Sequence, residues 1–142
     1  MKRMTASEPC HCNLIRKAAR RVSAIYDQEL AGSGLRITQY ALLAEIELAG
    51  PISITHLAAI MVMERNGLGH TLRLLERDGL LVTVTGNDRR SRTVSLTELG
   101  QRRLADLHSR WQRAQRRVEA TGLMNAIRQP LASFVARNIT VS

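Results

Sequence analysis

Apolar residues recur at helical spacing through the first third of the chain. Gly32 and Gly34 favour the end of a first helix, which is predicted over about residues 13–30. A second helix is predicted from Thr38, which can cap it, to residue 49, where Gly50 and Pro51 stop it. The apolar positions of the first helix lie three or four residues apart and are Leu14, Ala18, Val22, Ile25 and Tyr26.

Two further helical patterns, separated by a tight turn, occupy residues 54–61 and 65–78. Ser53 can cap the first of these helices. The second helix carries Leu68, Leu72 and Leu75, spaced by four and three residues, and ends at Gly79. A short helix, a tight turn and a longer helix in this order are typical of a helix-turn-helix, which presents its second helix to a major groove.

An alternating pattern of apolar and polar residues replaces the helical pattern in residues 80–85 and 92–96. Val82 and Val84 alternate with threonines in the first stretch, and Val94 and Leu96 alternate with polar residues in the second. The turn signal Gly86-Asn87-Asp88 joins them, so a β-hairpin is predicted. Its arginine-rich connection fits a solvated tip. Beside a helix-turn-helix we favour contacts to phosphates or to a minor groove.

A long helix is predicted from Thr97, a capping residue, to about residue 121. Gly122 separates it from a last helix, which contains Pro130 and which we expect to be kinked or split there. Apolar residues spaced by three and four form a seam on the long helix, namely Leu104, Leu107, Trp111, Ala114 and Val118. The apolar stripes of the flanking helices exceed what a small winged domain can cover. We therefore expect a dimerisation region, with packing inside one chain as the alternative.

These patterns together predict a mainly α fold with a small β-hairpin. We place a winged helix-turn-helix domain at residues 35–100 and helical dimerisation regions at residues 10–34 and 101–142. The hydrophobic fraction of 44% allows a core, and aliphatic side chains must build it because aromatic residues make up 3%. So few aromatic residues argue against a stacking platform for single-stranded nucleic acid.

Positive charge dominates the composition. The chain has 21 Lys and Arg residues against 12 Asp and Glu, a formal net charge of +9, and all but Lys2 and Lys17 of the basic residues are arginines. Arginine suits phosphates and guanine edges, although acidic partners and anionic membranes also fit a basic surface. No apolar run approaches the roughly 18 residues of a membrane helix, and no hydrophobic signal region opens the chain. We expect a cytoplasmic protein.

No catalytic pattern accompanies these features. The histidines His11, His56, His70 and His108 are scattered, and no spacing links them to an acid and a serine. The sequence contains neither a phosphate-binding loop nor a dinucleotide fingerprint. We therefore expect a protein that is not an enzyme and that uses no cofactor.

Five short segments carry a family likeness. They are Leu35-Arg36-Ile37-Thr38-Gln39-Tyr40, Ile54-Thr55-His56-Leu57-Ala58, Leu75-Glu76-Arg77-Asp78-Gly79-Leu80, Asp88-Arg89-Arg90-Ser91-Arg92 and Val94-Ser95-Leu96-Thr97-Glu98-Leu99-Gly100. In this order and spacing they resemble the MarR family of winged helix-turn-helix regulators over nearly the whole chain. The resemblance implies a homodimer that binds pseudo-palindromic double-stranded DNA, usually as a repressor, and releases it when a ligand or oxidation reshapes the dimer. A winged helix that binds another protein is the alternative, and a steep salt dependence of DNA affinity would distinguish the two.

The same resemblance assigns DNA contacts, with the helix at 65–78 in the major groove and the hairpin, or wing, in the minor groove. The implied contacts are Arg65, Asn66, Gly67, Gly69, His70 and Arg73 on the helix, and Asp88, Arg89, Arg90 and Arg92 in the wing. Within the wing, the resemblance has Asp88 orient Arg90. Relatives commonly carry Ser or Thr at the positions of Gly67 and Gly69, and Arg at that of His70. The two glycines either allow close backbone approach to DNA or leave a less specific reader.

Three interpretations of the signal to which the protein responds are open, and they depend on the motif Cys10-His11-Cys12. In organic-peroxide regulators of the family, tyrosines bond a cysteine at the start of the first helix. Cys12, Tyr26 and Tyr40 match those positions by spacing, although a further tyrosine of that site is missing here. Cys10, His11 and Cys12 could instead join ligands from elsewhere in a metal site. In the third interpretation the cysteines are inert, and a small aromatic or anionic effector lies between the dimerisation helices and the winged domain.

Overall fold

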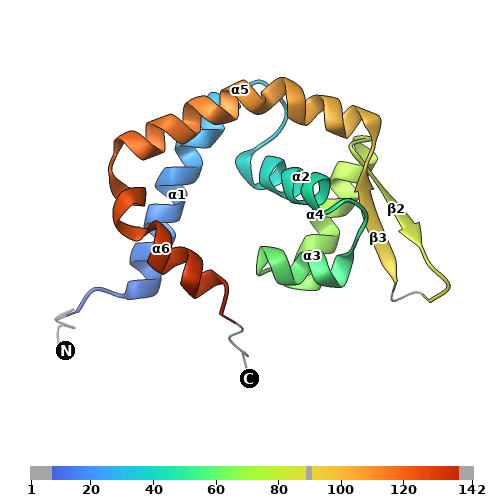
Figure 1. Cartoon of the computed structure of the whole chain (residues 1–142), viewed down its shortest axis with the longest axis horizontal. Coiled ribbons are helices and arrows are strands. Elements are labelled where there is room, and N and C mark those ends of the chain that lie inside the picture. The colour runs from blue at the N-terminus through green and yellow to red at the C-terminus, as the bar shows by residue number, and fades with distance from the viewer. Residues whose placement is uncertain (1–7, 89–90, 138–142) are drawn as a thin grey trace, which may run out of the picture.

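A computed structural model describes residues 8–88 and 91–137 of the chain. Its elements are α1 (His11–Glu29), α2 (Ile37–Ala49), β1 (Ile52–Ser53), α3 (Ile54–Met61), α4 (Arg65–Arg77), β2 (Leu81–Thr85), β3 (Arg92–Leu96), α5 (Glu98–Ala120) and α6 (Leu123–Val135). The long helix α5 spans the molecule and joins α1 and α6 at one end to α2, α3, α4 and the sheet at the other (Figure 1). The predicted mainly α, winged helix-turn-helix fold is confirmed.

Local capping residues begin the helices that the sequence placed most accurately. The hydroxyl of Ser53 accepts the His56 backbone N–H at 3.1 Å at the start of α3. The hydroxyl of Thr97 accepts the Gly100 N–H at 3.1 Å at the start of α5. Both bonds satisfy a backbone donor that the first turn of a helix leaves without a partner, so these two boundaries are fixed by neighbouring residues.

The start of α2 differs from the prediction, because Arg36 and not Thr38 is the N-cap residue. Asp27 lies near the end of α1. Its carboxylate accepts the Ile37 N–H at 2.8 Å. The Gln39 side chain accepts the Arg36 N–H at 3.0 Å. Asp27 of α1 thus takes the place of the predicted cap residue Thr38. It reaches the start of α2 only in the folded chain.

The sheet has three antiparallel strands in the order β1-β3-β2, whereas the sequence predicted a hairpin alone. The hairpin of β2 and β3 is confirmed, with Leu81 opposite Leu96 and Thr85 opposite Arg92. The added strand is two residues long and pairs Ile52 with Val94. It was missed because its pairing partner lies some forty residues away and the strand itself is too short to show alternation.

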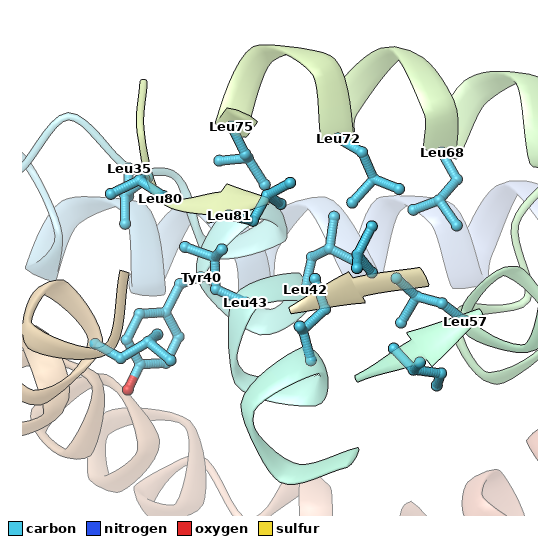
Figure 2. Packing of buried hydrophobic residues seen from close by; sticks show 14 of the residues in the cluster. Leu35, Tyr40, Leu42, Leu43, Leu57, Leu68, Leu72, Leu75, Leu80 and Leu81 are labelled. Atoms are coloured by element: carbon cyan, nitrogen blue, oxygen red, sulfur yellow. The ribbon is translucent and has the colours of Figure 1, made fainter. Parts of the chain in front are cut away.

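One buried cluster of aliphatic side chains holds α2, α3, α4 and the sheet together (Figure 2). Leu68, Leu72 and Leu75 of α4 point into it from a single face of the helix and are at most 3% exposed. Burial of each leucine contributes roughly 1.5–3 kcal/mol. That gain exceeds the roughly 1 kcal/mol by which each of Gly67 and Gly69 weakens the helix relative to alanine.

The seam predicted on α5 is packed inside the chain. Leu104 and Leu107 belong to the main cluster, and Ala114 and Val118 are buried further along the helix. By contrast, α1 and α6 contain no buried residue. The uncovered apolar surface of the flanking helices therefore lies on α1 and α6. In the described parts of the chain, no helix is long and apolar enough to cross a membrane.

The helix α6 runs through Pro130 as one continuous element, so of the two predicted outcomes, a kink or a split, the split does not occur. Proline removes one backbone N–H and leaves the carbonyl four residues earlier without its helical partner. Because Ala126 is exposed, water can satisfy that carbonyl.

The start of α5 lies against the loop that ends α4. The Leu80 carbonyl accepts the Thr97 N–H at 3.1 Å, and the Thr97 hydroxyl donates to the Gly79 carbonyl at 2.6 Å. Gly100 is buried there, and a Cβ atom built on it would lie 2.0 Å from the Leu80 carbonyl oxygen. The backbones of the two segments can approach this closely only where position 100 has no side chain.

We expect Gly100→Ala to destabilise the protein by roughly 2–3 kcal/mol, because neither backbone can move away without breaking the Thr97 bonds. Urea unfolding followed by circular dichroism measures this change. Gly67→Ala is the matched control, since no atom lies within 4 Å of a Cβ atom there. Equal stability of the two variants would contradict the close approach.

Candidate DNA interface

The face of α4 that is turned away from the core is polar and exposed. Arg65, Asn66, His70 and Arg73, which the family resemblance implied as DNA contacts, all lie on it. The turn before α4 contains Val62 in the left-handed region, at φ 52°. That conformation costs roughly 1–2 kcal/mol for a residue other than glycine, and the packing of α3 and α4 compensates for it.

Helix α4 and the wing meet at a basic cleft of about 330 Å³. Its lining residues are Ile54, Arg65, Asn66, Gly69, Arg73 and Arg92. A neighbouring hollow of about 250 Å³ shares Gly69, Arg73 and Arg92 and extends to Thr83 and Thr85 of β2. The structure therefore brings four of the six implied helix contacts to one cleft with Arg92 of β3, whereas Gly67 and His70 do not line it.

Two hydrogen bonds set the position of the wing relative to α4. The Thr83 N–H on β2 donates to the Glu76 carboxylate of α4 at 3.1 Å. At the base of the sheet, the Thr97 hydroxyl bonds to the Gly79 carbonyl just beyond α4. These bonds join α4 and the segment just after it to the sheet, on which the wing is built.

The arginines fall into two groups by their partners. On α5, Arg103 and Arg110 donate to the backbone carbonyls of Ser33 and Ala31, at 3.0 and 2.7 Å. Arg113 and Arg117, also on α5, form ion pairs with Glu29 of α1, so these four side chains tie the two helices together. Around the cleft the picture differs: among the described residues, no ion pair involves Arg65, Arg73 or Arg92. Their charge is available to an anion.

The wing turn is closely packed at its glycine. The Gly86 N–H donates to the Ser91 carbonyl at 3.3 Å, and the Ser91 hydroxyl donates to the Asp88 carbonyl at 2.7 Å. A Cβ atom on Gly86 would lie 2.3 Å from the Ser91 hydroxyl oxygen. Asp88 is exposed at this turn. The predicted contacts Arg89 and Arg90 lie outside the described residues.

Among the described residues, nothing requires glycine at positions 67 and 69 on the exposed face of α4. No atom lies within 4 Å of a Cβ atom on Gly67, and a Cβ atom on Gly69 would meet only the Arg73 guanidinium, at 3.6 Å. Neither residue has a positive φ. The fold would accept alanine at both, so the two glycines favour an explanation that lies outside the chain.

The residues predicted for redox sensing do not come together within one chain. Cys10 and Cys12 are exposed at the start of α1, and Tyr26 lies near its other end, roughly 20 Å away at a helical rise of about 1.5 Å per residue. Tyr26 donates a hydrogen bond to Gln115 of α5. Burial raises its pKa, the charge of Glu119 adds to the rise, and that of Arg128 opposes it. Tyr40 is buried in the core.

A second cavity, of about 440 Å³, lies between α2 and α5. It is lined by Tyr40, Ala41, Ala44, Glu45, Glu47, Leu48, Gln101, Leu104, Ala105, His108 and Trp111. The sequence suggested an effector near this junction but identified only Tyr40 of these residues. In the described part of the chain, no three His, Cys, Asp or Glu side chains are grouped so that they could hold a metal ion.

Comparison with known proteins places this geometry in a class. No protein-family model matches the chain, and no curated protein does. Among solved structures, MosR, a transcriptional regulator of M. tuberculosis in complex with DNA, is 34% identical, with a TM-score of 0.81 over 89% of this chain and 94% of that chain. A second structure of MosR is 32% identical, with a TM-score of 0.77 over 92% of this chain and 95% of that chain. A MarR-family regulator from Rhodococcus sp. RHA1 shares the fold at 22% identity, with a TM-score of 0.75 over 91% and 97% of the two chains.

The fold and its neighbours define a winged helix-turn-helix transcriptional regulator. The chain belongs to the MarR family of such regulators, as the resemblance of its motifs indicated.

We expect Gly67→Ala to raise the free energy of unfolding by roughly 0.5–1 kcal/mol, because alanine is the better helix former and the added methyl group meets open space. The same change should weaken DNA binding, because the methyl group would keep a base edge away from the α4 backbone. Thermal unfolding and fluorescence anisotropy measure the two effects. Gly122→Ala is the control, since its φ of +77° makes alanine unfavourable there. Unchanged DNA affinity in Gly67→Ala would favour the less specific reader.

Proposed function

We propose that the protein binds double-stranded DNA with α4 in the major groove and the wing of β2 and β3 in the adjacent minor groove. The observation that carries this proposal is the basic cleft, where Arg65, Arg73 and Arg92 surround a hollow and none has an ion pair among the described residues. Phosphate groups of DNA would supply the negative partners that these guanidinium groups lack within the protein. The structure of MosR, 34% identical to this chain, is a complex with DNA, which supports DNA as the partner.

We propose that two copies of the chain act together. Each chain has one reading helix, and a symmetric dimer would present two of them to half-sites about one helical turn apart. Apolar side chains on α1 and α6 are exposed in the single chain, including Leu14 and Ile15 at 59% and 61% and Phe134 and Val135 at 56% and 55%. A second copy that covers these helices would remove this surface from water.

The regulator acts, in this proposal, as a repressor that a small molecule releases from its operator. The cavity between α2 and α5 supports the proposal because of where it lies. Helix α2 packs against β3, and α5 continues from the sheet to α1 (Figure 1). A ligand that moves α2 relative to α5 would therefore change how the reading helix is held relative to α1 and α6.

We expect Arg73→Ala and Arg92→Ala each to weaken binding to an operator duplex by about tenfold and to lower the slope of log affinity against log salt by about one. Fluorescence anisotropy at several salt concentrations measures both quantities. The matched control is Arg77→Ala, which removes the same charge at the far end of α4, where Arg77 faces Asp78 at 3.8 Å. If the control weakens binding as much as the other two, the cleft is not the DNA site.

Oxidation of a cysteine is a second candidate for the release signal. Cys10 is the N-cap residue of α1, and its sulfur accepts the Asn13 N–H at 3.4 Å. Both Cys10 and Cys12 are exposed. Hydroperoxides oxidise accessible cysteines to sulfenic acid. Because Tyr26 is far from Cys12 along α1, the predicted tyrosine partners would have to come from a second chain.

We expect an organic hydroperoxide to lower the DNA affinity of the wild-type protein by at least about tenfold if this second candidate holds, and to leave Cys12→Ser bound. Gel-shift assays with and without a thiol reductant measure the change and its reversal. Cys10→Ser is the matched variant, and it separates the two sulfur atoms. Release that persists in Cys12→Ser would exclude Cys12 as the sensor.

A further inference from the structure

Aromatic rings form one wall of the cavity between α2 and α5. The rings of Tyr40 and Trp111 are stacked, with centroids 6.3 Å apart and planes inclined by 20°. The His108 ring is also stacked with that of Trp111, with centroids 5.5 Å apart and the same inclination. Leu104 and two alanines complete an apolar lining. A planar aromatic ligand can pack against the accessible part of this ring cluster in the offset-stacked or edge-to-face geometry that aromatic pairs favour.

The charge of this cavity is opposite to that of the protein. The chain carries a formal net charge of +9, yet neither lysine nor arginine is among the residues that line the cavity. Glu45 and Glu47, on α2, supply two carboxylates instead, and His108 is the one other lining residue that can ionise near neutral pH. An anionic ligand would meet two like charges there and would find no guanidinium or ammonium group to pair with.

The charge of Glu47 reaches the aromatic wall. Burial raises the pKa of the Tyr40 hydroxyl, and the negative charge of Glu47 raises it further. Glu45 is half-buried at the same rim. A ligand seated against the rings would therefore lie in a negative field, and the faces of the rings themselves attract cations.

We infer that the cavity takes a planar aromatic molecule that carries a cationic amine, with its ring against Tyr40 and Trp111 and its ammonium group toward Glu45 and Glu47. This inference rests on the proposed role of the cavity as the effector site and names the class of effector. The sequence-based expectations included an anionic effector. A cationic effector replaces it here, because the lining residues carry the wrong charge for an anion.

Three probes that share one ring and one chain length test the charge preference. They are tryptamine, tryptophol and indole-3-propionate, which are cationic, neutral and anionic near neutral pH. Binding is followed through the indole N–H resonance of Trp111 in nitrogen-15-labelled protein, since Trp111 is the single tryptophan. We expect tryptamine to bind at least about fivefold more tightly than tryptophol and at least about tenfold more tightly than indole-3-propionate. Equal affinities, the reverse order or no saturable binding by any probe would overturn the inference.

Charge-removing variants assign the preference to the two carboxylates. In Glu45→Gln/Glu47→Gln the three affinities should come to within about threefold of each other, because two partly exposed charges account for the difference. Asp106→Asn is the matched control. It removes an acidic charge from an exposed position on α5, outside the lining of the cavity, and should leave the order unchanged. A preference for tryptamine that survives the double variant would overturn the assignment.

DNA binding, measured separately on the same samples, distinguishes this inference from the proposed function. If tryptamine binds most tightly of the three probes but leaves operator affinity unchanged, the ligand class is supported and the effector role is overturned. Release of DNA by indole-3-propionate and not by tryptamine supports the effector role and overturns the ligand class. Release by tryptamine alone supports both.

Discussion

The packing of α4 on the core is the interaction on which the exposed surface depends. Leu68, Leu72 and Leu75 bury one face of the helix. The free energy gained by their burial exceeds the helix stability lost at Gly67 and Gly69. A helix with two glycines in its first turns would fray in isolation. Here the helix stays formed because its apolar face is packed on the core, so its polar face is available to DNA.

The distribution of arginine explains how a chain of such high charge remains folded while presenting a basic surface. The arginines of α5 that reach α1 neutralise Glu29 and satisfy carbonyls at the end of that helix. At the cleft, Arg73 and Arg92 have no acidic partner among the residues described. The cavity between α2 and α5 has the opposite charge, with Glu45 and Glu47 on its rim. One chain thus carries surfaces suited to a polyanion and to a small cation.

The sequence predicted those features that depend on neighbouring residues. The cap at Ser53, the leucine spacing of α4 and the strand of residues 92–96 follow from local chemistry, and the structure has all three. The features that it did not predict depend on distant residues. Asp27 satisfies the start of α2, Ile52 joins the sheet beside Val94, and the arginines of α5 have partners on α1. The acidic cavity was missed for the same reason, because α2 and α5 meet only after folding.

The central claim is that α4 and the wing of two symmetric copies read double-stranded DNA. Selection of bound sequences from a pool of random duplexes, followed by measurement of the number of chains on each selected duplex, tests it most directly. We predict a pseudo-palindrome with half-sites about one helical turn apart and two chains bound to each duplex. Recovery of no enriched motif, or of an asymmetric motif bound by a single chain, would contradict the claim.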